Sequence, residues 1–335
     1  MRVLVLLDKK TGHAHQAEAL ALAIASLTDV EIERIPAKPG RLGHNRLLAA
    51  LSRRRDIDPA RWLKRLYGID AAALARPGAI VSSGRPTVAA GIFLARIFGA
   101  PFIYAGRITG FDLADVALQL VASPRYAHEP KAAFAPIPTR VDAAALPPPR
   151  PLDTPGDLAG ASLALLVGGD APGYRYAERD WSALVALVRD TAARHGVRWR
   201  VATSRRSPEN WAGPFAAMAA DGTIDAFVDY RSAGPGSADR LHDADALVVT
   251  EDSLSMMAEA LATLRPVVAL KPAAVAPGFA TEVVAAMAAG GAMAVMPMAT
   301  TSAGSLAAAL IAAAPERENP RDRIARVLKP VLNLP

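Results

Sequence analysis

Hydrophobic positions in the first third of the chain follow two alternating spacings. Short runs rich in Val, Ile and Leu predict strands at 2–7, 30–35, 79–81 and 101–104. Ala and Leu at helical spacing predict helices at 14–26, in the basic region that follows the second strand, and at 86–98. Strands separated by helices are typical of a parallel sheet that is covered on both faces.

The same alternation starts again after a proline-rich segment. Residues 146–155 read Leu-Pro-Pro-Pro-Arg-Pro-Leu-Asp-Thr-Pro, which suits neither a helix nor a central strand. Beyond it we expect strands at 161–167, 197–203, 224–228, 246–249 and 266–270, and helices at 176–195, 208–220, 253–263, 279–289 and 303–313.

This pattern predicts an α/β fold with two doubly wound, Rossmann-like domains that face a cleft. We place the first domain at 1–145, a proline-rich linker at 146–160, the second domain at 161–315, and a C-terminal helix that packs back on the first domain at 316–335. Ligands of such folds bind beyond the carboxyl ends of the strands, so the chemistry is expected there.

Composition narrows the class of protein. A chain of 335 residues with 52% hydrophobic content supplies cores for two domains. The absence of cysteine excludes disulfides, thiolate metal sites and a cysteine nucleophile. The apolar run at 2–7 is too short for a secretory signal, and the longest apolar stretch, at 283–299, is mostly Ala, Gly and Met. We therefore expect a cytoplasmic protein of bacterial type with no spanning helix.

The charge of the chain is concentrated in one segment. Eight basic and two acidic side chains lie between residues 41 and 65, a local excess of six that equals the formal net charge of +6 of the whole chain. A nucleic-acid-binding protein usually spreads its basic residues along a face, so this basic island does not predict a nucleic-acid partner.

The strongest local motif runs from Val248 to Ala260. An apolar strand ends in a polar turn, and a helix begins with Asp252 or Ser253 as its cap. Free backbone N–H groups at that helix start, with the hydroxyls of Ser253 and Ser255, suit a diphosphate. Glu259 lies about two turns into the helix, where its carboxylate can accept hydrogen bonds from a ribose. The alternative is an ordinary capped helix with Glu259 on a solvated face.

Two further turns follow strands of the second domain. Gly168-Gly169-Asp170 allows close approach of a ligand to the backbone, and Thr203-Ser204-Arg205-Arg206-Ser207-Pro208 supplies two guanidinium groups that suit phosphate. Neither turn is a dinucleotide fingerprint or a P-loop, so a dehydrogenase or an ATPase has little support. For the second turn, an exposed surface loop remains the alternative.

The first domain offers a candidate base. His13, in Thr11-Gly12-His13, follows the first strand and is suited to deprotonate an acceptor hydroxyl, although a histidine at a helix start often only caps or packs. Ser82-Ser83-Gly84-Arg85-Pro86 places an arginine beside exposed amides, or is simply a good helix start. The dispersed histidines form no metal site, and no Gly-x-Ser-x-Gly elbow indicates a hydrolase.

Taken together these motifs resemble the ELM-one-like mitochondrial fission protein family, first named in plants, whose bacterial members are described as glycosyltransferases of the GT-B fold. The motifs that carry the resemblance are Asp8, Gly12-His13 and Gln16, Ser82 to Arg85, Gly168-Gly169, Thr203 to Glu209, Ala244-Asp245 and Thr250 to Ala260. The last two are long and specific.

The resemblance implies that the second domain binds a nucleotide sugar while the first presents the acceptor. It implies a nucleotide-sugar site made of Gly168, Gly169, Ser204, Arg205, Arg206, Glu251, Asp252, Ser253, Ser255, Met256 and Glu259. On the first domain it implies a catalytic His13 and the cleft residues Gly12, Gln16, Ser83, Gly84, Arg85 and Arg107.

The chain departs from the family pattern at three places. The triplet after the fourth strand is Ala105-Gly106-Arg107, which keeps only the arginine of the usual motif. Gly234-Pro235-Gly236 replaces a motif with an amide and an aromatic ring. Leu264-Arg265-Pro266-Val267 replaces a motif whose first residue is a glycine suited to the left-handed conformation.

These observations predict a metal-independent glycosyltransferase that uses a nucleotide-diphosphate sugar as its substrate and needs no cofactor. Its acceptor is expected to be a hydroxyl group of lipid-linked or cell-envelope type. Two alternatives stay open: a non-catalytic membrane-surface adaptor of the fission-factor type, and a nucleotide-sugar epimerase.

The basic island bears on the location of the protein. Apolar helical faces flanked by basic residues suit an anionic membrane surface or a lipid-linked acceptor, which predicts a protein that is peripheral on the inner membrane. The side chains expected at this surface are Arg53, Arg54, Arg55, Trp62, Lys64 and Arg65. The alternative is that the apolar faces pack on the sheet of the first domain and the arginines are only solvated.

Overall fold

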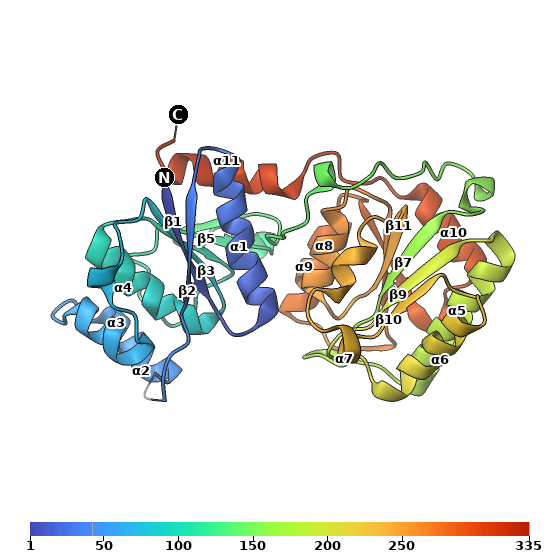
Figure 1. Cartoon of the computed structure of the whole chain (residues 1–335), viewed down its shortest axis with the longest axis horizontal. Helices are drawn as coiled ribbons and strands as arrows, with labels where there is room; N and C mark the ends of the chain where they lie inside the picture. Colours follow the sequence, from blue (N-terminus) through green and yellow to red (C-terminus); the bar gives the residue numbers. More distant parts are fainter. Residues whose placement is uncertain (42, 335) are drawn as a thin grey trace. The chain divides into compact units, whose positions relative to one another are not determined.

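The computed structural model describes residues 1–41 and 43–334 of the chain. It divides into two compact units, of which unit 1 comprises Met1–Arg140 with Pro320–Pro335, and unit 2 comprises Val141–Asn319. Both units are α/β structures built on a parallel sheet (Figure 1).

The sheet of unit 1 has six strands in the order β2-β1-β3-β4-β5-β6, and every neighbouring pair is parallel. The strands are β1 (Arg2–Leu7), β2 (Glu31–Pro36), β3 (Ala79–Ser83), β4 (Phe102–Ala105), β5 (Leu118–Val121) and β6 (Ala132–Phe134). Helices cover both faces: α1 (Thr11–Ala25), α2 (Asn45–Arg53), α3 (Pro59–Tyr67), α4 (Val88–Phe98) and α11 (Pro320–Val331), with 3-10 turns at Ala71–Ala73, Arg85–Thr87 and Pro124–Tyr126.

Two apolar clusters hold the layers of unit 1 together. On one face of the sheet, α2, α3 and α4 bury a cluster that includes Leu48, Leu63 and Phe93. On the other face, α1 packs against α11, and Ile324 and Leu328 of α11 join the cluster around α1 and the sheet (Figure 1). The last helix of the chain is therefore part of the first unit's core.

The sheet of unit 2 repeats the plan, with six parallel strands in the order β10-β9-β7-β11-β12-β14. These are β7 (Ser162–Leu166), β9 (Arg198–Ala202), β10 (Ala226–Val228), β11 (Ala246–Thr250), β12 (Val267–Lys271) and β14 (Met293–Pro297), with a separate two-stranded ladder of β8 (Tyr174–Arg175) and β13 (Ala274–Val275). The helices are α5 (Glu178–His195), α6 (Glu209–Ala220), α7 (Tyr230–Ala233), α8 (Leu254–Leu261), α9 (Phe279–Ala288) and α10 (Ala303–Ala312), and 3-10 turns lie at Ala143–Ala145, Pro155–Leu158, Ser237–Leu241 and Met298–Thr300.

The proline-rich segment is fastened to unit 2 by side chains of that unit. The buried guanidinium of Arg265 donates to the backbone oxygens of Ala244 and Pro147, the latter over 2.5 Å. Asp245 accepts from the amide of Arg150 and from the first amide of β7, each over 2.8 Å. These contacts give the Ala244-Asp245 motif a structural task, because it anchors the segment beside β7.

The structure confirms the predicted α/β class with two doubly wound parallel sheets. Three strands of these sheets, β5, β6 and β14, were not expected from the sequence, and neither was the ladder of β8 and β13. Since all strands of a sheet run parallel, the loops that leave their carboxyl ends gather at one edge. In unit 1 these loops begin at Asp8, Gly84 and Gly106, and in unit 2 at Val167, Thr203 and Glu251.

Candidate functional site

The carboxyl edge of the first sheet holds a histidine paired with a carboxylate. Asp8 follows β1 directly, and its Oδ2 lies 2.6 Å from Nδ1 of His13 in the first turn of α1. The Asp8 side chain is only 3% exposed, while that of His13 is 34% exposed. A carboxylate at Nδ1 favours the tautomer with the proton on that nitrogen, which leaves Nε2 as an acceptor. The pair has the arrangement of an oriented general base.

Gly84 closes over this pair. Its φ is +90°, a region that favours glycine, and a Cβ there would lie 2.5 Å from His13 Nδ1 and 2.6 Å from Asp8 Oδ2. The backbone of the loop after β3 thus rests against the imidazole and the carboxylate. Of the predicted site residues, the structure brings His13 and Gly84 together. It adds Asp8, which belongs to the family motif but had been given no role at the site.

A serine and a glutamine link the surrounding elements. Ser83 Oγ lies 2.7 Å from Oε1 of Gln16 on α1 and 3.0 Å from the carbonyl of Ala105 at the end of β4. Both predicted residues therefore join α1, β3 and β4. Gly12 lies half-buried one position before His13.

The buried phenol of Tyr104 interacts with Gly84, Arg85 and Asp8 at this edge. Burial raises the pKa of its phenol, a hydrogen bond with the backbone of Gly84 and the charge of Arg85 lower it, and the charge of Asp8 raises it. The guanidinium of Arg85 donates to Thr109 Oγ1 over 2.9 Å, so it stays at the rim of the same edge.

Arg107 is occupied by an ion pair. Its guanidinium donates to both oxygens of Glu129, with a shortest distance of 2.6 Å, and lies 4.3 Å from the ring centroid of Tyr126. The pair lowers the pKa of Glu129 through the hydrogen bond from Arg107. Any ligand that used Arg107 would have to compete with this carboxylate.

In unit 2, one buried carboxylate holds three loops together. Asp252 follows β11, and its side chain has no exposed surface. Oδ2 accepts from the amide of Gly169 over 3.1 Å and from Arg206 over 2.5 Å, while Oδ1 accepts from the phenol of Tyr176 over 2.8 Å. The loops after β7, β9 and β11 therefore converge on Asp252. We call these four residues the Asp252 hub.

The two glycines after β7 are required by this packing. A Cβ on Gly168 would lie 2.2 Å from Asp252 Oδ1, and a Cβ on Gly169 would lie 2.1 Å from the carbonyl of Arg206. The amide of Gly168 donates to Thr250 Oγ1 over 2.7 Å. The sequence predicted ligand contact for Gly168, Gly169, Arg206 and Asp252, and in this structure these residues contact one another.

Tyr176, which was not among the predicted site residues, extends the hub into the core. Its ring stacks on Trp181 with centroids 4.8 Å apart, and Trp181 stacks on Trp211 at 6.2 Å. Burial raises the pKa of the Tyr176 phenol, and the neighbouring Asp252 raises it further. The available signal was a tyrosine placed a few residues after the Gly-Gly turn.

Glu251 is also turned inward. It is 2% exposed, its Oε1 accepts from the phenol of Tyr174 over 3.0 Å, and its Oε2 has no hydrogen-bond partner within the described residues. Burial raises the pKa of Glu251, although the hydrogen bond from Tyr174 and the charge of Lys271 oppose the shift. The carboxyl therefore favours its neutral form more than an exposed glutamate does.

The start of α8 keeps its amide groups available. Ser253 occupies the N-cap position, as expected, but its side chain makes no capping hydrogen bond, and Asp252 is committed to the hub. The first amides of a helix have no acceptor within the helix itself. Ser255, Met256 and Glu259 lie half-buried on α8. The local dipole and these amides suit an anionic group.

The loop after β9 presents one of its two arginines outward. Ser207 Oγ lies 2.8 Å from the carbonyls of both Val167 and Gly168, and the amide of Ser204 donates to that hydroxyl over 2.9 Å. These bonds fix the turn against the end of β7. Arg206 is held by the hub, whereas the side chain of Arg205 is exposed.

The apolar faces of the basic island lie in the core of unit 1. Leu48 and Leu51 on α2 and Leu63 and Leu66 on α3 are buried, and Trp62 packs against the same cluster. The alternative in which these faces pack on the domain is therefore the one that the structure shows. They are not available for insertion into a lipid surface.

Much of the island's charge is also neutralised. Arg54 pairs with Asp56, Arg55 with Asp112 and Asp115, and Lys64 with Asp70, while Arg65 lies over the ring of Trp62. The Arg54 hydrogen bond lowers the pKa of Asp56 to about 2. Arg53 differs from these residues because its guanidinium donates to the backbone carbonyl of Gly110 over 2.8 Å.

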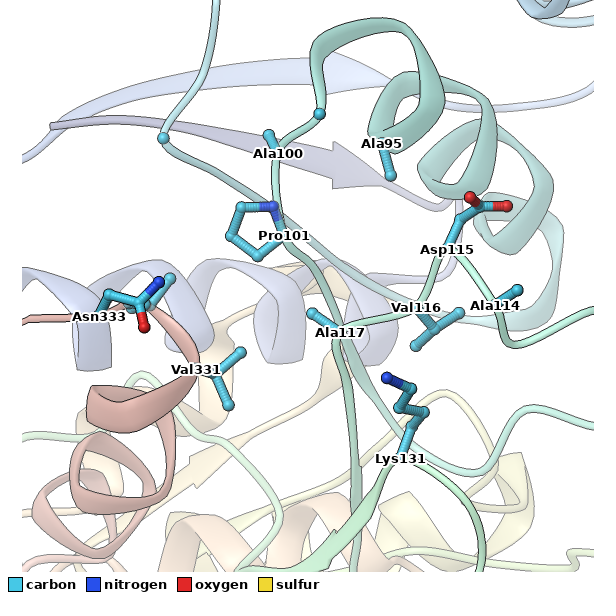
Figure 2. Close-up of a pocket in the computed structure, with 13 residues that line it drawn as sticks. Ala95, Ala100, Pro101, Ala114, Asp115, Val116, Ala117, Lys131, Val331 and Asn333 are labelled. Atoms are coloured by element: carbon cyan, nitrogen blue, oxygen red, sulfur yellow. The ribbon is translucent and has the colours of Figure 1, made fainter.

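A cavity of about 540 Å³ lies elsewhere in unit 1. Figure 2 shows Pro101, Ala117 and Lys131 lining it, together with Val331 and Asn333 from the last segment of the chain. Pro101, Ala117 and Lys131 directly precede β4, β5 and β6, so the cavity lies at the amino edge of the sheet. None of the predicted site residues lines it.

The described residues offer neither a metal-binding cluster nor a membrane-spanning helix. Within the described ranges, no group of three or more histidine, aspartate or glutamate side chains is arranged to hold a metal ion. Among the helices of residues 1–41 and 43–334, none has both the length and the apolar content needed to cross a bilayer.

Two doubly wound parallel sheets in one chain, each with polar loops at its carboxyl edge, define the GT-B class of α/β proteins. The chain belongs to the family described as Mitochondrial fission ELM1, whose model matches residues 136–329. This confirms the family that the sequence motifs indicated.

Solved structures of similar fold include MnaA of S. aureus with UDP, at 12% identity and a TM-score of 0.55, covering 100% of this chain and 97% of that chain. They also include the UDP-GlcNAc 2-epimerase of Methanocaldococcus jannaschii, at 11% identity and a TM-score of 0.57, covering 99% of this chain and 100% of that chain. At these identities the likeness establishes the fold. Among proteins of curated function, none matches the sequence.

Proposed function

We propose that this protein transfers a sugar from a nucleotide-diphosphate sugar to the hydroxyl group of an acceptor of lipid-linked or cell-envelope type, without a bound metal ion. The observation that carries the proposal is the Asp8–His13 pair, in which a buried carboxylate 2.6 Å from Nδ1 orients a half-exposed imidazole at the carboxyl edge of the first sheet.

The chemistry that we assign to unit 1 is removal of the acceptor proton. The acceptor oxygen forms a bond to the anomeric carbon of the donor sugar, and the bond between that carbon and the diphosphate oxygen breaks. The electron pair of the broken bond leaves with the nucleoside diphosphate, while the acceptor proton passes to Nε2 of His13. Asp8 then stabilises the imidazolium that forms.

We assign donor binding to unit 2. The amides at the start of α8, with the side chains of Ser255 and Met256, would surround the diphosphate, and Glu259 would accept from the ribose hydroxyls. The exposed Arg205 would pair with a phosphate oxygen or approach the nucleobase. In this proposal the Asp252 hub and Glu251 act beneath the ligand, because their side chains are buried and hydrogen-bonded. They hold the donor loops in position.

Calorimetric titration with UDP-, GDP-, CMP- and ADP-sugars tests donor binding. UDP-sugars come first, because one similar structure contains UDP and the other is a UDP-GlcNAc 2-epimerase. We expect saturable binding of at least one donor, weakened in Glu259→Ala. If the folded protein binds none of these donors, the proposal is wrong.

With a donor in hand, His13→Ala should lower kcat by roughly 10²- to 10⁴-fold, the usual contribution of a general base, and leave the donor Kd unchanged. Asp8→Asn should lower kcat by less, because the imidazole stays in place but loses its oriented proton. Chelation of divalent ions should leave the transfer rate unchanged. Loss of transfer on chelation, restored by a divalent ion, would contradict the metal-free step.

A second candidate is a nucleotide-sugar epimerase, favoured by the likeness to a UDP-GlcNAc 2-epimerase over nearly the whole chain. An epimerase would convert the donor sugar in the absence of any acceptor, which nuclear magnetic resonance of the sugar detects. A non-catalytic adaptor would instead bind liposomes or a protein partner equally well as wild type, His13→Ala and Glu259→Ala.

A further inference from the structure

Arg53 of the basic island and Arg85 of the Ser82–Pro86 motif both contact one exposed loop of unit 1. The loop follows β4 and contains Thr109 and Gly110, both exposed. Arg53, at the end of α2, donates to the carbonyl of Gly110 over 2.8 Å. Arg85, after β3, donates to Thr109 Oγ1 over 2.9 Å. A Cβ added to Gly110 would lie 3.5 Å from the guanidinium of Arg85.

Both guanidiniums keep their charge available. Neither forms an ion pair with a carboxylate in the part of the chain that the structure describes, and both side chains are exposed. The acids of the adjoining segment are already engaged, since Asp112 pairs with Arg55 and Asp115 pairs with Arg55 and Arg96. Within the described residues, each of the two arginines donates one hydrogen bond, to a neutral oxygen, which leaves further N–H groups for another acceptor.

This cationic loop adjoins the proposed base. Arg85 directly follows Gly84, whose backbone rests against His13 and Asp8, and its charge acts on the buried phenol of Tyr104 together with that of Asp8. A ligand that placed a hydroxyl at His13 would therefore extend toward Arg85. The guanidinium group pairs phosphate oxygens through two parallel hydrogen bonds, so a phosphate is the group that this loop suits.

We propose that the acceptor carries a phosphate group, and that Arg85 and Arg53 bind it at the Thr109–Gly110 loop while the acceptor hydroxyl lies at His13. This inference rests on the proposed function for the role of His13, but the phosphate site itself requires no donor. It gives Arg53 of the basic island, together with Arg85, a specific role in substrate recognition.

The test uses the whole protein without a donor. Glycerol 3-phosphate serves as a soluble phosphate monoester with free hydroxyls, with glycerol as its neutral counterpart, and phosphatidic acid vesicles serve as the lipid source, with phosphatidylcholine vesicles as theirs. Binding is measured by calorimetry for the soluble pair and by co-sedimentation for the vesicles.

We expect binding of one or both phosphate probes and of neither neutral probe. Arg85→Gln and Arg53→Gln should each weaken it on the order of 10-fold, as loss of a charged hydrogen bond does, and Arg85→Lys should weaken it less. Arg61→Gln is the matched control, because Arg61 is an exposed arginine of the same island outside this loop, and it should leave binding unchanged. Binding of the vesicles alone would assign the phosphate to a lipid, and binding of the soluble monoester alone would assign it to a free metabolite.

Two results would overturn the inference. One is equal weakening of phosphate binding in all three glutamine variants, because that would indicate diffuse electrostatic attraction. The other is an absence of phosphate-dependent binding. Circular dichroism and unfolding midpoints establish that each variant is folded. The two proposals fail separately. Phosphate binding that depends on Arg85, with no transfer from any donor, would leave this site standing and remove the transferase. Sugar transfer to a neutral acceptor, at a rate unchanged in Arg85→Gln, would support the transferase and remove the phosphate site.

Discussion

At the scale of single residues, polar side chains that follow parallel strands differ in whether they are exposed to a ligand or buried in contacts with the protein itself. His13 is half-exposed and has a free second nitrogen, whereas Asp252 has no exposed surface and is fully used by its neighbours. Both follow strands of a parallel sheet, and the sequence predicted a functional role for each. The difference between them depends on contacts with residues far along the chain, such as Tyr176 and Arg206, and a local motif does not contain that information.

Glu251 gives a prediction on pH at this scale. Its folded pKa is raised by burial, so the stabilisation from its neutral form is fully present below the unfolded value of about 4.3 and is lost as pH rises through the folded pKa. Glu251→Gln should therefore become increasingly more stable, relative to wild type, as pH rises through that window.

Urea unfolding at several pH values between about 4 and 8 measures this difference. Tyr174→Phe is the companion variant, because loss of its hydrogen bond should raise the pKa of Glu251 further and extend the decline of stability to higher pH. A stability difference between Glu251→Gln and wild type that does not change with pH would contradict the assigned cause.

At the scale of elements, strands and helices with strong periodicity could be predicted, and weakly patterned ones could not. β1 and β11 are rich in Val and Leu and were expected near their observed bounds. β14, Met293–Pro297, lies in a stretch of mostly Ala, Gly and Met and holds a single β-branched residue, Val295, and β6 has only three residues. Their pairing comes from neighbouring strands, which supply the backbone partners that the local sequence does not specify.

The turn after α8 yields a prediction at this scale. Leu264 stands where the family motif has a glycine, and its φ is +57°, in the left-handed region. A leucine in this conformation carries backbone strain that a glycine would not. Leu264→Gly should relieve about 1 kcal/mol of backbone strain and so offset the loss of a half-buried side chain, giving unchanged or higher stability.

Leu254→Gly is the matched control, since Leu254 is also half-buried but lies in the first turn of α8. It should destabilise by at least about 1 kcal/mol, because it adds glycine to a helix and removes apolar contact. The two variants are compared by thermal and chemical unfolding. Equal destabilisation by both would show that strain at Leu264 is negligible.

At the scale of the whole molecule, the last helix is the part of unit 1 most distant in sequence from the rest of it. Leu328 of α11 is fully buried in the cluster around α1, although unit 2 separates the two helices along the chain. Leu328→Ala should destabilise unit 1 by about 2–5 kcal/mol, the usual cost of truncating a buried leucine. Leu310→Ala, a buried position of α10, should destabilise unit 2 instead.

Hydrogen exchange followed by mass spectrometry distinguishes the two effects, because it reports the opening of each unit separately. The Leu328 variant should show faster exchange in α1 and β1 while β7 and β11 stay protected. Uniform acceleration throughout both units would contradict the assignment of α11 to the first core.

The return of α11 to unit 1 also has a consequence during synthesis. A nascent chain presents the strands of unit 1 before unit 2, but Ile324 and Leu328, which join the cluster of α1 and the sheet, are translated only after unit 2. Unit 2 is continuous and is complete earlier than the layer that closes unit 1. The part of this cluster that α11 covers therefore stays exposed while unit 2 is translated, and transiently exposed apolar surface of this kind is what chaperones act on.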